Sequence, residues 1–234
     1  MHITLNHINK SYQEGLIRHA ILSDITIDFP TGQFSVILGK SGSGKSTILN
    51  LIGGIDLPDS GSISIGDSQI TPMSDRDRTL FRRKNIGFVF QFFNLIPTLT
   101  VLENVCLISE LDKKDKKETI DRSIGILDQV GLADRQNTMP DRLSGGEQQR
   151  VAIARALAHD PPIILADEPT GNLDEKTGHI TMELLNDLIK NSGKTLIIAT
   201  HSADVLKYAD RIYQIKDKQL EMQIKDKQLE MVSN

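Results

Sequence analysis

The sequence has 234 residues, of which 38% are hydrophobic and 25% charged, proportions of a globular chain long enough for one large domain or two lobes. Its net charge of −4 argues against a nucleic-acid partner bound by neutralising phosphates. The single cysteine, Cys106, excludes an internal disulfide and fits a reducing compartment. The N-terminus lacks the pattern of a secretory signal, and the uncharged stretch from Ile86 to Leu102 is shorter than the ~20 residues of a spanning helix. We therefore expect a soluble chain.

Two stretches near the N-terminus, Ile3–Ile8 and Ala20–Phe29, alternate apolar and polar residues as half-buried strands do. Residues Lys10–Gly15 interrupt the alternation and predict a loop. Two strands joined by a loop predict an antiparallel β layer, and Tyr12 falls in that loop.

A glycine-rich stretch, Gly39–Thr47, matches the phosphate-binding pattern G-x-x-x-x-G-K-[ST]. Phe34–Leu38 predicts a strand before it, and Ile48–Ile52 predicts a helix after it. Glycine lets the backbone curl so that its N–H groups surround a phosphate, whereas a plain surface turn does not require this order of elements. Tyr12 then either stacks on the adenine of a bound nucleotide or is an ordinary strand-end residue. The expected nucleotide-binding residues of the loop are Gly39, Lys40, Ser41, Gly42, Ser43, Gly44, Lys45, Ser46 and Thr47.

In such a loop Lys45 reaches the β- and γ-phosphates, and the Ser46 hydroxyl completes the ligand shell of Mg²⁺. Further along, Gly61–Gly66 predicts a strand, Ser74–Lys84 a polar helix and Ile86–Phe90 a buried strand. Gln91 follows that strand, where ligands bind in open α/β sheets. Its amide is a candidate contact for Mg²⁺ or the attacking water, and the alternative is a solvated strand end.

The middle third of the sequence is rich in helix signals and poor in strand signals. Phe92–Pro97 places apolar residues in a loop, which marks either a local core or a docking surface. Thr100–Glu103 is a capping box that predicts a helix start, and Ser123–Val130 continues in helical rhythm. We interpret residues 92–159 as a helical lobe inserted into an α/β core.

The stretch LSGGEQQR begins at Leu143. Ser144 and Glu147 form a second capping box, and Gly145 and Gly146 leave the helix end open to an anion. The alternative is an ordinary helix cap with a flexible lead-in.

Acidic residues end the next apolar run, Ile163–Ala166. With a phosphate loop upstream, Asp167 is expected to hold Mg²⁺ and Glu168 to polarise the attacking water, although two acids can also simply end a strand. Gly171–Asp174 predicts a turn into a helix that runs to Lys190. His201 follows the buried strand Thr195–Thr200, where it either contacts the γ-phosphate or is structural.

Arg211–Ile215 is expected to close the regular structure. The nonapeptide QIKDKQLEM, Gln214–Met222, is then repeated without change as Gln223–Met231. Two copies are too few for a repeat fold, so we interpret the second as a duplication or an artefact rather than a functional element.

Together these motifs resemble the nucleotide-binding subunit of ABC transporters, over nearly the whole chain to about residue 215. The stretch LSGGEQQRVAIARAL is specific to that family, whereas the phosphate loop alone is not. The resemblance implies one ABC ATPase domain at 1–215, followed by a tail at 216–234. Its α/β fold would be a P-loop NTPase core, about 1–91 and 160–215, with an antiparallel β layer and the inserted helical lobe.

The stretches NIGFVFQFFNLIPTLTVLENV and ADEPTGNLD are most similar to the lipoprotein-release, macrolide-export and cell-division branch, although amino-acid importers share part of the first. The resemblance implies ATP and Mg²⁺ as cofactors, with Ser46, Gln91 and Asp167 at the metal. Tyr12 would stack on adenine, Gln91 would couple the site to the membrane subunit, Glu168 would be the catalytic base and His201 would contact the γ-phosphate. Ser144, Gly145 and Gly146, with Glu147, would bind ATP held by the opposite subunit.

The implied partners are a second copy of the chain and an integral membrane permease that docks near Phe92–Pro97. The chain would then act in the cytoplasm, on the inner face of the membrane. A soluble ABC protein of DNA repair would need a long coiled-coil insertion, and one of translation would need a second phosphate loop. The sequence contains neither, so both alternatives are disfavoured. A nucleotide sensor without turnover is disfavoured because Glu168 is present.

Overall fold

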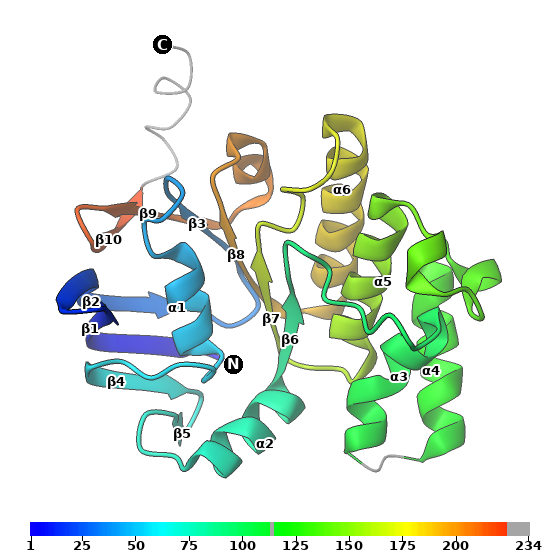
Figure 1. The fold of residues 1–234 in the computed structure, drawn as a ribbon, viewed down its shortest axis with the longest axis horizontal. Coiled ribbons are helices and arrows are strands. Elements are labelled where there is room, and N and C mark those ends of the chain that lie inside the picture. The colour runs from blue at the N-terminus through cyan, green and yellow to red at the C-terminus, as the bar shows by residue number, and fades with distance from the viewer. Residues whose placement is uncertain (113–114, 224–234) are drawn as a thin grey trace. The chain divides into compact units, whose positions relative to one another are not determined.

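The structure is a computed structural model that describes residues 1–112 and 115–223. It divides into two compact units (Figure 1). The first unit contains Met1–Arg82 and the described residues after Ser192, and the second unit contains Arg83–Ser192. No helix in the described ranges is long and apolar enough to cross a membrane.

The first unit carries an antiparallel sheet in the order β2-β1-β4-β5. Its strands are β1 (Ile3–Glu14), β2 (Ile17–Phe29), β4 (Ser60–Ile65) and β5 (Ser68–Gln69). The apolar residues of β1 that alternate in the sequence, Ile3, Leu5 and Ile8, are fully buried. The predicted antiparallel layer is confirmed.

The loop predicted at Lys10–Gly15 is wrong, because β1 continues to Glu14 and Tyr12 pairs with His19 of β2. This end of the ribbon is mostly exposed, so cross-strand hydrogen bonds rather than an apolar face hold it. Alternation of apolar residues therefore does not mark it. Tyr12 is consequently a strand residue.

A second sheet in the first unit contains β3 (Phe34–Leu38), which pairs in parallel with β8 (Thr195–Thr200) and with β9 (Arg211–Lys216). The helix α1 (Lys45–Ile52) follows β3 and packs on β8, and a short 3-10 helix, Ala203–Tyr208, follows β8. All six residues of β8 are buried, as expected for a strand covered on both faces.

The regular structure does not close at Ile215, because β10 (Gln219–Gln223) forms a hairpin with β9. The turn is made by Asp217 and Lys218, both with positive φ. The first copy of the nonapeptide thus forms this hairpin, and no glycine or asparagine marks its turn. The second copy lies outside the described residues, apart from Gln223 at its start.

The second unit contains two parallel strands, β6 (Ile86–Val89) and β7 (Ile163–Asp167). Its helices are α3 (Val101–Leu111), α4 (Lys116–Gln129), α5 (Gly145–Ala158) and α6 (Glu175–Ser192). Short 3-10 turns lie at Ala133–Arg135 and Pro140–Arg142. Helix α2 (Asp75–Asn85), most of which belongs to the first unit, precedes β6. Helix α5 packs against α3, α4, α6 and β6. The described part of 92–159 contains helices and no strand, as the sequence predicts, whereas its limits as a separate lobe remain a prediction.

The contact between α5 and β6 depends on a glycine. A Cβ added at Gly87 would collide with the carbonyl oxygen of Ala156 on α5 and with the side chain of Ile164 on β7. A backbone carbonyl of a buried helix cannot move aside as a surface side chain can. The small residue therefore sets how closely the helix lies on the strand.

We expect Gly87→Ala to lower the free energy of unfolding by about 1–3 kcal/mol, because it overpacks this contact. Gly125→Ala is the matched control: Gly125 lies in α4, and a Cβ there would meet no atom within 4 Å. It should raise the free energy of unfolding by about 0.5–1 kcal/mol through helix propensity. Urea unfolding measures both values, and a Gly87→Ala protein as stable as the parent would contradict the close-packing argument.

Candidate functional site

The glycine-rich loop joins the end of β3 to the start of α1 in the first unit. Gly42 and Gly44 have φ of +75° and +102°, a region that favours glycine. A Cβ at Gly44 would also lie 2.9 Å from Cγ2 of Ile21. Gly44 precedes α1 as its N-cap without a side-chain hydrogen bond, so the helix end suits an anion.

Two side chains of the loop support this interpretation. Lys45 is buried, and its Nζ donates to the carbonyl oxygens of Gly39 at 2.8 Å and Lys40 at 3.1 Å. The Ser43 hydroxyl is buried and has no hydrogen-bond partner among the described residues. A bound phosphate would offer charged acceptors to both groups, so the loop fits the phosphates of a nucleotide.

The histidine predicted at the site lies at the same sheet edge as this loop. Leu38 of β3 is opposite Thr200 of β8, and the backbone N–H of Gly39 donates to the Thr200 carbonyl at 3.4 Å. His201 is the next residue and is exposed. Parallel pairing therefore brings the loop and His201 out of the sheet side by side.

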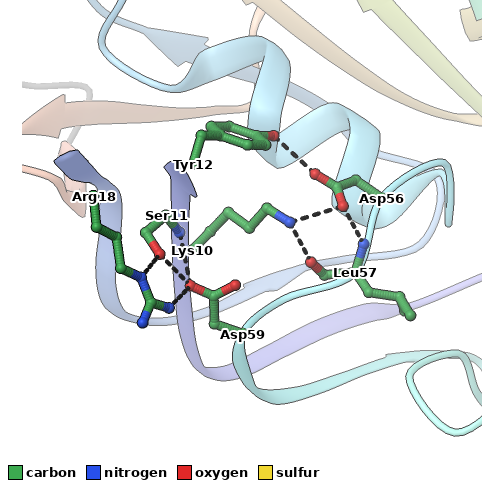
Figure 2. A network of polar contacts seen from close by, with 7 residues as sticks. All are labelled: Lys10, Ser11, Tyr12, Arg18, Asp56, Leu57 and Asp59. Atoms are coloured by element: carbon green, nitrogen blue, oxygen red, sulfur yellow. Dashed lines mark hydrogen bonds and ion pairs between the residues drawn. The ribbon is translucent and has the colours of Figure 1, made fainter. Parts of the chain in front are cut away.

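Tyr12 lies beside α1 in the same unit (Figure 2). Its side chain is 42% exposed, and its hydroxyl donates to Oδ2 of Asp56 at 2.8 Å. Partial burial and the bond to Asp56 raise the pKa of Tyr12, while the nearby Thr47 side chain opposes the shift. Thr47 lies in α1, so Tyr12 lies close to the helix that starts at the phosphate loop.

In the second unit, Gln91 and Glu168 follow two paired parallel strands. Val89 of β6 is opposite Ala166 of β7, so both chains leave the pair at the same end. Gln91 and Asn172 share two hydrogen bonds: Gln91 Nε2 donates to Asn172 Oδ1 at 3.4 Å, and Asn172 Nδ2 donates to the backbone carbonyl of Gln91 at 2.8 Å. Asn172 lies in the turn predicted at Gly171–Asp174, and its pairing with Gln91 was not predicted from the sequence.

The acidic pair at the end of β7 has an unusual backbone. Glu168 has φ of +44°, which is uncommon for a residue other than glycine. Its carbonyl accepts the N–H of Gly171 at 3.0 Å, which closes a turn directly after the strand. Asp167 and Glu168 are both half-buried. Backbone strain of this kind, of order 1–3 kcal/mol, is concentrated at functional sites.

The start of α5 is the predicted capping box. The Ser144 N–H and hydroxyl both donate to Oε2 of Glu147 at 2.8 Å, and the Glu147 N–H donates back to Ser144 Oγ at 3.3 Å. These bonds from Ser144 lower the pKa of Glu147. The box engages the N–H of Glu147 but not those of Gly145 and Gly146.

The glycines of this motif lie against two other segments of the second unit. A Cβ at Gly146 would lie 2.5 Å from Cγ2 of Thr177 on α6. One at Gly145 would lie 3.6 Å from Leu173 and 3.8 Å from the ring of Phe93. The start of α5 therefore lies close to the segment after β6 and to the turn after β7.

The apolar segment Phe92–Pro97 has one exposed and one half-buried phenylalanine. Phe92 is 72% exposed, whereas Phe93 is half-buried and its ring lies near Gly145. Phe93 and Asn94 both have positive φ, and Arg155 of α5 donates to the carbonyls of Phe93 at 2.8 Å and Asn94 at 2.5 Å. Burial lowers the pKa of Arg155. Sequence reasoning missed Arg155, although a lone charge within the apolar run after Arg150 was a signal.

The candidate residues thus form two groups, one in each unit. The first contains Tyr12, the phosphate loop and His201. The second contains Gln91, the Ser144–Glu147 motif, Asp167 and Glu168. Within each group, the structure brings together residues that are far apart in the sequence.

Comparisons with known proteins agree on one family. The family model described as "ABC transporter" matches residues 22–171. An uncharacterized ABC transporter ATP-binding protein of Mycobacterium tuberculosis is 52% identical over 218 residues, which cover 93% of this chain and 88% of that protein. The macrolide export ATP-binding/permease protein MacB of Rhodopirellula baltica is 41% identical, over 92% of this chain and 32% of that protein.

Solved structures are similar over nearly the full length. The dimeric structure of the ABC transporter cassette MJ0796, a protein of Methanocaldococcus jannaschii, has a TM-score of 0.86 and 44% identity, covering 94% of this chain and 96% of that one. A post-hydrolysis dimer of the same cassette bound to ADP and Pi also has a TM-score of 0.86.

Proposed function

We propose that this chain, which belongs to the ABC transporter family and to its ATP-binding proteins, hydrolyses ATP to power a separate membrane permease. The observation that carries the proposal is the loop after β3. Its left-handed glycines, its uncapped helix end and the buried Lys45 together suit the phosphates of a nucleotide. The solved ADP- and Pi-bound dimer of a relative supports hydrolysis as the reaction.

In the first unit the loop residues would hold the phosphates, with Lys45 on the β- and γ-phosphates. Tyr12 would stack on adenine, and His201 would contact the γ-phosphate. In the second unit Glu168 would polarise the attacking water. Ser46, Gln91 and Asp167 would hold Mg²⁺, whose charge would offset that of the phosphates.

Glu168→Gln should lower steady-state ATP hydrolysis by ~10²–10⁴-fold while ATP still binds, because the amide cannot accept a proton from water. Phosphate release and bound-nucleotide quantitation measure the two effects. Glu175→Gln is the control, since Glu175 is an exposed carboxylate in the first turn of α6, and it should retain wild-type turnover. Near-normal turnover of Glu168→Gln would remove Glu168 from the role of base.

The partner we propose is a permease that docks on the exposed part of Phe92–Pro97. Phe92 and Ile96 support this, since they are 72% and 36% exposed in one short segment, and grouped apolar exposure is typical of an interaction site. Gln91, one residue earlier, would transmit the docking state to the site. Similarity to a macrolide export ATP-binding/permease protein supports export as the direction of transport.

Phe92→Asp should reduce co-purification with membrane proteins from detergent-solubilised membranes, because it places a charge in an apolar contact. Basal ATP hydrolysis of the isolated chain is measured beside it and should fall far less. Leu16→Asp, a change at a fully exposed apolar residue outside this segment, is the control and should leave co-purification unaffected. Equal co-purification of wild type and Phe92→Asp would contradict docking at this residue.

We also propose a homodimer in which ATP lies between the phosphate loop of one chain and the Ser144–Glu147 motif of the other. A γ-phosphate held by Lys45 still needs charge stabilisation on its far face, which helix N–H groups such as those of Gly145 and Gly146 supply. The dimeric solved structures of a relative support this assembly.

This arrangement predicts complementation. Lys45→Ala and Ser144→Arg chains should each be inactive alone, whereas a mixed dimer carries both lesions in one site and leaves the other intact. An equal mixture should then recover about a quarter of wild-type activity at most, if pairing is random and sites act independently. ATP-dependent dimerisation of Glu168→Gln is measured beside it by light scattering. An inactive mixture together with a monomeric Glu168→Gln protein in saturating ATP would refute the shared site.

A further inference from the structure

A charged pair that the proposed function does not use lies next to Tyr12 (Figure 2). Lys10 is only 8% exposed, and its Nζ donates to Oδ1 of Asp56 and to the carbonyl of Leu57, both at 2.7 Å. The other carboxylate oxygen, Oδ2, accepts the Tyr12 hydroxyl at 2.8 Å. One carboxylate therefore holds both the ammonium group and the phenol.

These contacts restrict the Tyr12 ring in two different ways. The hydroxyl bond fixes the long axis of the ring but not its plane, because rotation about that axis leaves the oxygen in place. The plane is restricted by Lys10, whose Nζ lies 5.0 Å from the ring centroid, within cation–π range. Lys10 itself is held by Asp56 and Leu57, so it cannot follow a turning ring.

Stability alone is a weak reason for such an arrangement. A largely buried ion pair gains little net free energy, because desolvation offsets the attraction between the charges. The ring that this pair restrains is nonetheless 42% exposed, and it lies beside the helix that starts at the phosphate loop. A fixed and exposed aromatic face is more useful for binding than for packing.

We propose that Asp56 and Lys10 are positioning residues that hold the Tyr12 ring ready to stack on the adenine of the bound nucleotide. This inference rests on the proposed function, which assigns stacking to Tyr12. The ammonium group engages one face of the ring, and the base takes the opposite face. Because the ring is already oriented, less side-chain freedom is lost when the nucleotide binds. The Tyr12 hydroxyl is committed to Asp56, so the ring recognises the base by stacking.

Asp59 offers a matched control in the same segment. Its Oδ2 accepts the backbone N–H of Ser11 at 2.9 Å, the Ser11 hydroxyl at 2.5 Å and Nη2 of Arg18 at 2.7 Å. Asp59, like Asp56, holds the segment Asp56–Asp59 against β1. None of these Asp59 bonds involves the Tyr12 hydroxyl. Loss of Asp59 should disturb the local fold without releasing the ring.

The test measures the dissociation constant of Mg²⁺–ADP for the full chain by isothermal titration calorimetry, since ADP carries the same base and is not turned over. Tyr12→Phe, which keeps the ring, and Asp56→Ala should each raise the dissociation constant about three- to tenfold. Asp56→Asn keeps an oxygen acceptor and should lie between wild type and Asp56→Ala. Asp59→Ala should stay within about twofold of wild type, since it leaves the ring held.

A double-mutant cycle separates positioning from a general structural effect. In a Tyr12→Ala background, Asp56→Ala should cause no further loss of affinity, because there is no ring to orient. Equal loss in both backgrounds would overturn the proposal and leave the proposed function intact. No loss in Tyr12→Ala itself would overturn stacking and this inference together. If Asp56→Ala fails to fold, the test rests on Tyr12→Phe. A Tyr12→Phe protein that binds Mg²⁺–ADP with the wild-type dissociation constant would then overturn the proposal.

Discussion

Parallel strand pairing determines where the candidate chemistry of this protein lies. Parallel neighbours end at the same edge of a sheet, so residues that follow them meet in space whatever their separation in sequence. In the first unit the pairing of β3 with β8 brings the phosphate loop and His201 together. In the second unit the pairing of β6 with β7 does the same for Gln91 and the acidic end of β7. The strands themselves are mostly apolar and buried. Strand residues therefore provide the packing, and the residues that follow the strands provide the candidate chemistry.

Helix α5 links the candidate functional segments of the second unit. Its first turn carries the capping box and lies against Phe93, Leu173 and Thr177. Arg155, further along the same helix, holds the carbonyls of two residues with left-handed backbone in the segment after β6. A guanidinium suits this role because its donors lie in a rigid plane and can reach two acceptors at once. A movement of Phe92–Pro97 would therefore pull on α5 through Arg155, and α5 is the helix that presents Ser144.

Sequence patterns were most informative where a single backbone rule applies. The phosphate loop, both capping boxes and the buried strands were predicted because glycine spacing, cap spacing and apolar runs depend on few neighbours. The segment Lys10–Gly15 was predicted as a loop because this end of the β1–β2 hairpin is mostly polar and exposed, so no apolar alternation marks it. Its bonds to Asp56 and Asp59 join residues more than 40 positions apart in the sequence. The β9–β10 turn uses Asp217 and Lys218 at positive φ, and Lys218 stands where turn rules favour glycine.

The contacts of the candidate sites that were not predicted from the sequence have one feature in common. Asn172, Arg155 and Asp56 act through hydrogen bonds to residues 81, 62 and 44 positions away in the sequence. Local spacing contains no information about such pairs, whereas an unusual residue can suggest one. Arg155 in an apolar helix was such a case, because a charge there requires a partner.

The capping box at Ser144 places an electrostatic condition on the proposed shared site. The pKa of Glu147 is lowered, chiefly by the backbone and hydroxyl bonds from Ser144, so a carboxylate lies beside the place where a γ-phosphate would approach. Two like charges that close oppose binding unless they are compensated. Arg135 supplies part of the compensation, with its Nη2 3.8 Å from Oε1 of Glu147, and Arg150 contributes a further attraction. The N–H groups of Gly145 and Gly146 lie outside the box, so the phosphate would meet donors while the carboxylate stays turned towards Ser144. Close packing requires glycine at position 146, where a Cβ would lie 2.5 Å from Cγ2 of Thr177, whereas a Cβ at Gly145 would make only ordinary contacts. Glycine at position 145 is therefore better explained by binding than by packing.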